Sequence, residues 1–143
     1  FTMKHIILYL MPLILSMTFI ACESDSINLP YAYDMDKAYN LDIPKETAIY
    51  IKSQTEFENL FADNEAKPKT DIPFSDGILM IVKGVSSHGI SKVEKTLVPS
   101  GNHYNLSICI TQNLTTSMET WYVAYVIPYN YIDKVHLDLK YIQ

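Results

Sequence analysis

Two serines and a histidine stand side by side in the one segment of this sequence that offers a nucleophile and a base together. Ser86, Ser87 and His88 carry the hydroxyl and imidazole groups that nucleophilic hydrolysis needs. Neighbouring side chains on an extended chain point to opposite sides, so a direct hydrogen bond from serine to histidine is not expected. The Gly-x-Ser-x-Gly pattern of a nucleophile elbow is absent as well. The sequence therefore predicts a polar loop ending at Gly89, with no catalytic residue, in a protein that is not an enzyme.

The residues that bind metals in proteins are too scattered here to predict a metal site. His103 and His136 lie on different expected strands and lack a third ligand. Asp34 and Asp36 have the Asp-x-Asp spacing of a calcium loop, but the glycine and the closing glutamate of an EF-hand are missing. We interpret them as solvated carboxylates and expect neither a metal nor another cofactor.

The two cysteines have different surroundings. Cys22 follows the small residue Ala21 at the end of an apolar run, residues 6–20, which a lysine precedes. This layout is typical of a signal peptide. The run contains a proline and falls short of the ~20 apolar residues of a membrane-spanning helix, so an uncleaved anchor is the less favoured reading. We expect residues 1–21 to be removed and Cys109 to remain an unpaired thiol.

The residues around the cleavage point carry a resemblance. Phe19-Ile20-Ala21-Cys22 resembles the lipoprotein box of Bacteroidetes, in which the cysteine is acylated and becomes the first mature residue. The resemblance implies a lipid on Cys22 that anchors the protein in the outer membrane, on its periplasmic or cell-surface face. Glu23-Ser24-Asp25 is similar to the acidic export signal of such lipoproteins, and Asp25-Ser26-Ile27 matches their O-glycosylation pattern, which implies a glycan on Ser26. A plain polar linker is the alternative reading of both motifs.

The composition of the chain excludes one class of partner. Its 143 residues include 11 Lys and Arg against 16 Asp and Glu, a formal net charge of −5, and every basic residue is a lysine. The net charge repels a polyanion, and the forked arginine donor that reads phosphates and bases is missing, so we expect no nucleic-acid binding. The residues after the signal peptide are enough for one domain with one core.

A lead-in and a capped helix open the mature chain. Residues 22–47 follow neither the helical nor the strand period, and we interpret them as a tether with a short edge strand near its end. Ser53-Gln54-Thr55-Glu56 is a capping box in which the Glu56 carboxylate reaches back to the Ser53 amide. A helix is therefore predicted there, with Phe57, Leu60 and Phe61 on one apolar face.

The rest of the chain predicts strands. They are expected at residues 48–52, 77–85, 90–98, 103–111, 121–127 and 134–141. The strand at 77–85 is apolar on both faces and reads as central, whereas those at 103–111 and 134–141 alternate apolar and polar residues. The fold class predicted is α+β, an antiparallel β-sheet of about six strands packed on one short α-helix.

Those elements, in that order, resemble a known domain over residues 48–142. The chain is similar there to the C-terminal domain of PrcB, the protease-complex-associated polypeptide. Three stretches carry the similarity: Gly77-Ile78-Leu79-Met80-Ile81-Val82, the loop from Gly84 to Gly89, and Trp121-Tyr122-Val123-Ala124-Tyr125-Val126-Ile127-Pro128. The family has Gly-Gly-Tyr where this chain has His88-Gly89-Ile90. The resemblance implies that residues 48–143 form a PrcB-like domain that acts by protein contact rather than by catalysis.

These observations predict a lipid-anchored, non-catalytic protein-interaction module. Its partner is expected to be another envelope protein, and the resemblance implies a protease-associated accessory or inhibitor-like role. Two connections are predicted to make the contact. They contribute Ser86, Ser87, His88 and Gly89 from one loop, and Met118, Trp121 and Tyr122 from the other.

Two alternatives stay open at this point. Trp121 can instead open a core strand. The protein can also bind a surface glycan, through an aromatic platform of Tyr122, Tyr129 and Tyr131.

Overall fold

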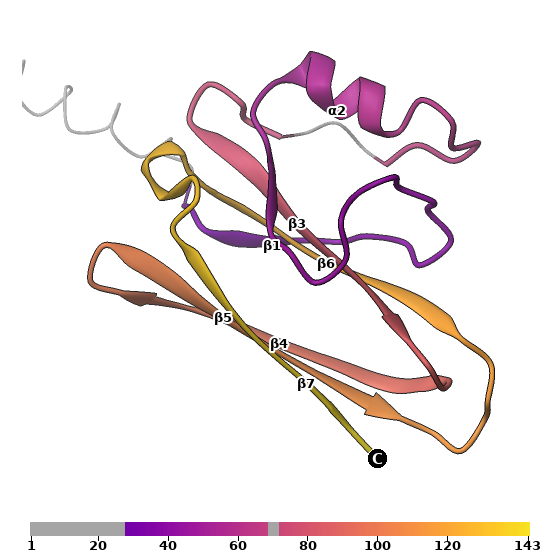
Figure 1. Ribbon diagram of the computed structural model, residues 1–143. Coiled ribbons are helices and arrows are strands. Elements are labelled where there is room, and N and C mark those ends of the chain that lie inside the picture. Colours follow the sequence, from indigo (N-terminus) through magenta and orange to yellow (C-terminus); the bar gives the residue numbers. More distant parts are fainter. Residues whose placement is uncertain (1–27, 69–71) are drawn as a thin grey trace, which may run out of the picture.

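Seven strands form two facing sheets in the computed structural model, which describes residues 28–68 and 72–143 (Figure 1). One sheet has the strand order β1-β6-β3-β2 and is the central layer; the other, β4-β5-β7, is the outer sheet. In chain order the elements are β1 (Tyr31–Tyr33), β2 (Ile49–Ile51), α2 (Gln54–Leu60), β3 (Gly77–Ser86), β4 (Ile90–Ser100), β5 (His103–Gln112), β6 (Glu119–Pro128), the 3-10 helix η2 (Tyr129–Tyr131) and β7 (Val135–Ile142). The predicted class, α+β with strands packed on one short helix, is confirmed.

The long apolar strands β3 and β6 decide this layered architecture. Every residue from Ile78 to Val82 is fully buried, and Trp121–Ile127 are buried as well. Strands with apolar residues on both faces need cover on both sides. The outer sheet covers one face of the pair, and α2 with the lead-in covers the other (Figure 1).

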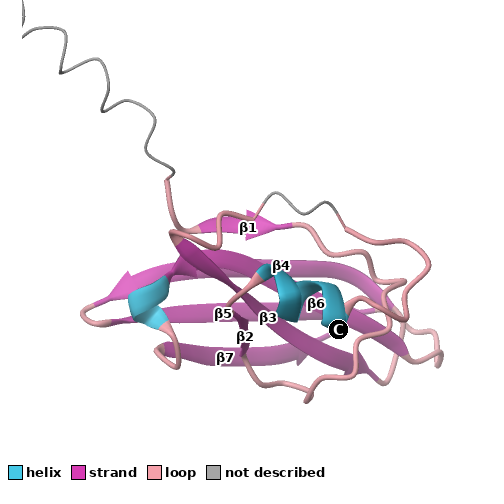
Figure 2. Ribbon diagram, turned by 90° about the horizontal axis from the view of Figure 1, so that it is seen from above, coloured by secondary structure: helices cyan, strands magenta, loops and turns pink. Residues whose placement is uncertain are grey.

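Helix α2 begins where the capping box predicts. The Ser53 hydroxyl accepts from the Glu56 amide at 3.2 Å, and the side chains of Phe57 and Phe61 are each 1 % exposed. The predicted bond from the Ser53 amide to the Glu56 carboxylate is wrong. That carboxylate accepts instead from the amide of Lys52, at 2.8 Å. Figure 2 looks down through α2 onto the strands that it covers.

The lead-in is part of the fold, so its interpretation as a tether is wrong for residues 31–47. Strand β1 pairs antiparallel with β6 from Tyr31↔Val126 to Tyr33↔Ala124, and the side chain of Leu41 is fully buried. The physical reason is area, because a helix of seven residues is too short to cover the outer faces of both β3 and β6. The lead-in supplies the missing cover.

The single antiparallel sheet is also corrected: the strands form two sheets, and β5 pairs with β7 in parallel. After β5 the chain crosses to the central sheet as β6, and after η2 it crosses back as β7. Two reversals of direction leave β7 running the same way as β5. Alternation in β5 and β7 is as predicted, with Tyr104, Leu106, Ile108 and Ile110 buried.

Candidate interaction surface at one end of the sandwich

The two connections predicted to make contacts lie together at one end of the sandwich. They are the last residue of β3 with the bend that follows it, residues 86–89, and the loop between β5 and β6, residues 113–118; we call them the paired loops. The Gly89 amide donates to the Thr115 carbonyl at 3.2 Å, and the Asn113 amide donates to the Gly89 carbonyl at 2.8 Å. A Cβ at Gly89 would lie 2.2 Å from the Thr115 hydroxyl oxygen, so glycine is what lets the loops approach.

Ser86 is a structural residue rather than a nucleophile. Its side chain is fully buried, and its hydroxyl accepts from the Gln112 amide group at 2.8 Å and from the His88 backbone amide at 3.2 Å. The bond from Gln112 fastens the end of β3 to β5, and the bond from His88 holds the bend. The hydroxyl is therefore committed to holding the loop.

The expectation that serine and histidine cannot meet in this loop is wrong. The Ser87 hydroxyl lies 2.9 Å from Nδ1 of His88, because the backbone bends here instead of staying extended. A hydrolytic triad also needs a group that orients the base. Among the described residues, the hydrogen bonds give His88 no carboxylate partner, so the pair is incomplete as a triad.

Large apolar side chains stand exposed on the second of the paired loops. Leu114 is 89 % exposed and Met118 is 71 % exposed. At the start of this loop the Asn113 side chain accepts from the Thr115 amide at 2.9 Å and from the Thr115 hydroxyl at 2.6 Å, an Asx turn that fixes the loop. The connection predicted to make contacts runs from Leu114 to Trp121, and Met118 is the apolar residue singled out in it; Leu114, its first residue, is the more exposed of the two.

Trp121 and Tyr122 do not belong to this exposed surface. Trp121 is 2 % exposed and its indole N–H donates to the Tyr141 hydroxyl at 3.2 Å; Tyr122 is 8 % exposed. The Tyr122 hydroxyl accepts from the Leu41 amide at 3.1 Å and donates to the Tyr39 carbonyl at 2.9 Å. Burial raises the pKa of Tyr122 above its usual value. The alternative reading of Trp121 as a core residue is correct. Both side chains are too buried to act as exposed anchors on the loop, although both line the groove described next.

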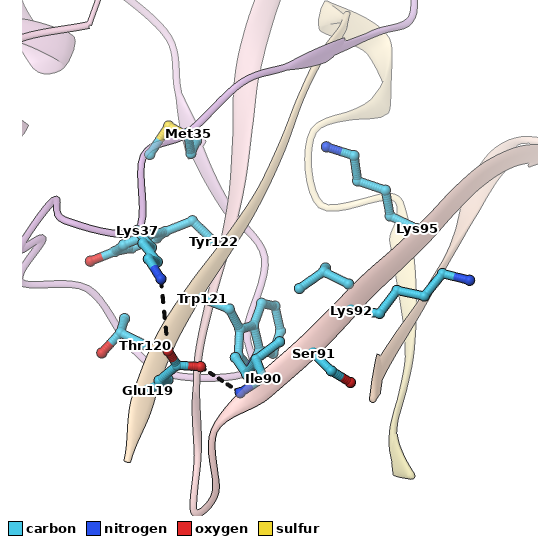
Figure 3. Close-up of a pocket in the computed structure, with 11 residues that line it drawn as sticks. Met35, Lys37, Ile90, Ser91, Lys92, Lys95, Glu119, Thr120, Trp121 and Tyr122 are labelled. Atoms are coloured by element: carbon cyan, nitrogen blue, oxygen red, sulfur yellow. Dashed lines mark hydrogen bonds and ion pairs between the residues drawn. The ribbon is translucent and has the colours of Figure 1, made fainter. Parts of the chain in front are cut away.

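A groove opens directly beside the paired loops, between β4, the start of β6 and the lead-in (Figure 3). Its volume is about 350 Å³. Lys37 forms an ion pair with Glu119, with 3.7 Å between Nζ and the carboxylate oxygen, and the other oxygen of Glu119 accepts from the Ile90 amide. No local sequence pattern predicts the groove, because its walls come from three segments far apart in the chain.

The aromatic platform for a glycan does not assemble. Tyr122 lies near the start of β6 and Tyr129 follows its end, so roughly 23 Å separates them at the rise of an extended chain. The ring of Tyr131 packs on that of Tyr104, with centroids 4.3 Å apart. One sugar cannot stack on all three predicted residues.

The histidines meet without forming a metal centre. The rings of His103 and His136, on neighbouring strands β5 and β7, stack with their centroids 4.1 Å apart. Within residues 28–68 and 72–143, no cluster of three or more His, Cys, Asp or Glu side chains could hold a metal ion.

The predicted membrane features belong to the start of the chain. Cys22 and Ser26, the predicted lipidation and glycosylation sites, lie outside the described residues. In the part of the chain that the structure describes, no helix is both long and apolar enough to span a membrane.

Comparison with known proteins adds no family at this point. No protein-family model matches the sequence, and no match was found among curated proteins or among solved structures. The function therefore has to be argued from the surface itself.

Proposed function

We propose that this protein is a lipid-anchored envelope protein that acts as a non-catalytic protein-interaction module through its paired loops. One observation carries the proposal. Leu114 and Met118 are more exposed than any other large apolar side chain among the described residues, and both stand on the loop at 113–118. Exposed apolar surface is unfavourable in water, so a contact that covers both side chains would be stabilised by their burial.

The construction of the loop supports the same proposal. A rigid sandwich that presents contact residues on its connections is a common design for binding proteins. The Asx turn at Asn113 and the hydrogen bonds at Gly89 hold the loop before any partner arrives, which lowers the entropy lost on binding. The thioether of Met118 is flexible and polarisable, and it adapts to the shape of a partner.

The proposed partner is another protein of the envelope. The PrcB-like pattern of residues 48–142 favours an envelope protease, with this chain as an accessory or inhibitor-like subunit. Acylation of Cys22 would hold the two proteins at the same membrane, which raises the effective concentration of each for the other.

Crosslinking in the native envelope tests the proposed function. A photo-crosslinking amino acid at Thr116, which is exposed between Leu114 and Met118, should trap a discrete partner band. The double variant Leu114→Ser, Met118→Ser should lose most of that band while its circular dichroism spectrum stays unchanged. Val98→Ser is the matched control, because Val98 is 48 % exposed on β4 and lies outside the loops.

An unchanged band in the folded double variant would contradict the proposal. The glycan alternative has its own signature in the same experiment. Capture that survives proteolysis of the envelope proteins but is lost after periodate oxidation of sugars would replace the protein partner by a glycan.

A further inference from the structure

The groove beside the paired loops lies between two open sheet edges. Pairing of β1 with β6 stops at Tyr33↔Ala124, and within the described residues no strand pairs with Glu119–Val123 on that side. On the other wall, β4 is the edge strand of the outer sheet and, among the strands that the structure describes, pairs only with β5. A free edge offers backbone N–H and C=O groups to any extended chain that comes alongside.

The inner face of β4 is incompletely covered at this groove. Val93 is opposite Ile110 in the ladder and so faces the interior, yet Val93 is 41 % exposed whereas Ile110 is fully buried. Lys95, two residues further, is opposite the buried Ile108 and faces the same way. An apolar residue and a cation therefore alternate on one face, with nothing of the central sheet fully covering them.

The charge of the groove differs in sign from that of the chain. Three lysines line it, Lys37, Lys92 and Lys95, against the single carboxylate of Glu119, in a chain whose formal net charge is −5. Lys37 pairs with Glu119, and Lys92 pairs with Glu94 at 3.5 Å. Among the described residues, Lys95 takes part in no ion pair. Its Nζ lies 5.7 Å from the centroid of the Tyr125 ring. Lys95 is thus the cation that an acidic ligand can engage without first breaking an ion pair.

We propose that this groove binds an extended, acidic segment of the partner protein, which adds as a strand to the free edge of β4. Side chains two residues apart on such a segment point the same way. The segment would therefore place an apolar side chain against Val93 and a carboxylate against Lys95, in an apolar-x-acidic spacing. Strand addition of this kind takes its affinity from main-chain hydrogen bonds and its specificity from the alternate side chains. The inference rests on the proposed function, because it names the partner segment for the surface next to the paired loops.

A structural role for Lys95 has to be separated from this one. Inward-pointing lysines on edge strands also prevent sheets of two molecules from pairing edge to edge. In that role Lys95 would keep a second copy of this chain, the competing occupant, away from the β4 edge, and the wild-type chain would stay monomeric without binding the peptide. A peptide titration together with the oligomeric state distinguishes the two.

The probe is a blocked nonapeptide, Thr-Val-Thr-Glu-Thr-Val-Thr-Glu-Thr, titrated into the full chain in detergent micelles and followed by fluorescence anisotropy. Its control is the same peptide with both glutamates replaced by lysine. We expect saturable binding of the acidic peptide only, weakened at high salt because the contact is charged. Lys95→Glu should weaken it at least ~10-fold through charge reversal. The matched control, Lys140→Glu, makes the same charge change at an exposed position of β7 and should leave the affinity unchanged.

A second pair of variants tests the apolar contact. Val93→Thr keeps the shape of the side chain and should weaken the peptide several-fold, whereas Val98→Thr, on the opposite face of the same strand, should not. Equal affinity for the acidic and basic peptides, or full affinity in folded Lys95→Glu, would overturn the proposal. So would concentration-dependent dimers of the wild-type chain, seen by sedimentation, that exclude the peptide.

The outcomes for the groove and for the loops are separable. If the peptide fails to bind while the Leu114 and Met118 variant still loses its crosslink, the groove proposal falls and the proposed function stands. If the peptide binds as expected although the loop variant keeps its crosslink, the groove proposal holds and the loops are not the contact.

Discussion

At the scale of single residues, Gly84 and Trp121 set how the two central strands meet the outer sheet. The two residues are opposite each other in the β3–β6 ladder, and the indole ring lies across the glycine. A Cβ at Gly84 would lie 2.1 Å from a carbon of that ring. The ring is also held through its N–H, which donates to the hydroxyl of Tyr141 on β7. Trp121 therefore links three strands through one side chain.

Gly84→Ala is expected to lower the free energy of unfolding by about 1–3 kcal/mol, because the added methyl group would overlap the Trp121 ring, which is 2 % exposed and would have to shift. Denaturant unfolding followed by the fluorescence of Trp121 measures this, since the chain has a single tryptophan. Gly101→Asn is the control. Gly101 has a φ of 63° with nothing within 4 Å of its Cβ position, and asparagine tolerates that conformation, so its midpoint should hardly change. Equal midpoints for Gly84→Ala and the wild type would mean that the ring is not locked.

At the scale of elements, the short helix α2 contributes to stability through its packed face much more than through its cap. Ser53→Ala removes one exposed capping bond and should cost about 1 kcal/mol. Phe57→Ala or Phe61→Ala removes a ring that is 1 % exposed and should cost about 3–5 kcal/mol each. Urea unfolding of the three variants measures these losses of unfolding free energy and ranks them. Similar costs for the serine and the phenylalanines would show that the helix packs loosely on β3 and β6.

The sequence predicts elements well where the signal is local. The Ser53 cap and the alternation of β5 depend on neighbours within a few residues, and both are confirmed. The burial of β3 on both faces is confirmed for the same reason, since an apolar run by itself demands two covers.

What the sequence does not predict depends on contacts between distant segments. The pairing of β1 with β6 and the burial of Leu41 follow from the shortness of α2, which no local pattern in the lead-in records. Trp121 lies in a strand that is apolar on both faces. The sequence alone therefore does not show whether its side chain is buried in the core or exposed as a contact residue. Lys95 did leave a signal, because it interrupts an inward row, Val93-x-Lys95-x-Leu97, that otherwise alternates as a packed strand does.

At the scale of the whole molecule, the tyrosines that are removed from water on folding should make the protein less stable at alkaline pH. Burial raises the pKa of six tyrosines among the described residues: Tyr39, Tyr50, Tyr104, Tyr122, Tyr125 and Tyr141. A raised pKa in the folded state means that the native protein holds the phenol proton more tightly than the unfolded chain does. Their contribution is therefore fully present below about pH 10, where unfolded tyrosine ionises, and is lost as the pH rises through the folded values.

We expect the urea midpoint to fall steeply above about pH 10, together with the appearance of phenolate absorbance. Tyr125→Phe tests the cause, because burial alone raises the pKa of Tyr125. That variant should show a shallower fall than the wild type. An identical slope in the variant would assign the alkaline loss to other groups, such as the lysines.

The long axis of the sandwich predicts which end would face the membrane if Cys22 carries the proposed lipid. The described chain enters near Leu29, beside Gly77 at the η2 end, while the paired loops lie at the far end of β3 and β6 (Figure 1). The ten residues of β6 span about 33 Å between these ends. Residues 23–28 can span at most ~20 Å even when fully extended. A lipid on Cys22 would thus hold η2 close to the bilayer and present the paired loops away from it.

Fluorescence quenching by a nitroxide in the lipid headgroups measures this orientation. In a Cys109→Ser background, a fluorophore at Asn130→Cys, in η2, should be quenched much more than one at Met118→Cys. Adding Cys22→Ser should remove both the quenching and the incorporation of labelled fatty acid, since the anchor is lost. Retained fatty-acid labelling in Cys22→Ser would contradict the lipidation site. Equal quenching at residues 118 and 130 in the lipidated chain would instead contradict the orientation, and it would place the paired loops within reach of partners at the bilayer surface.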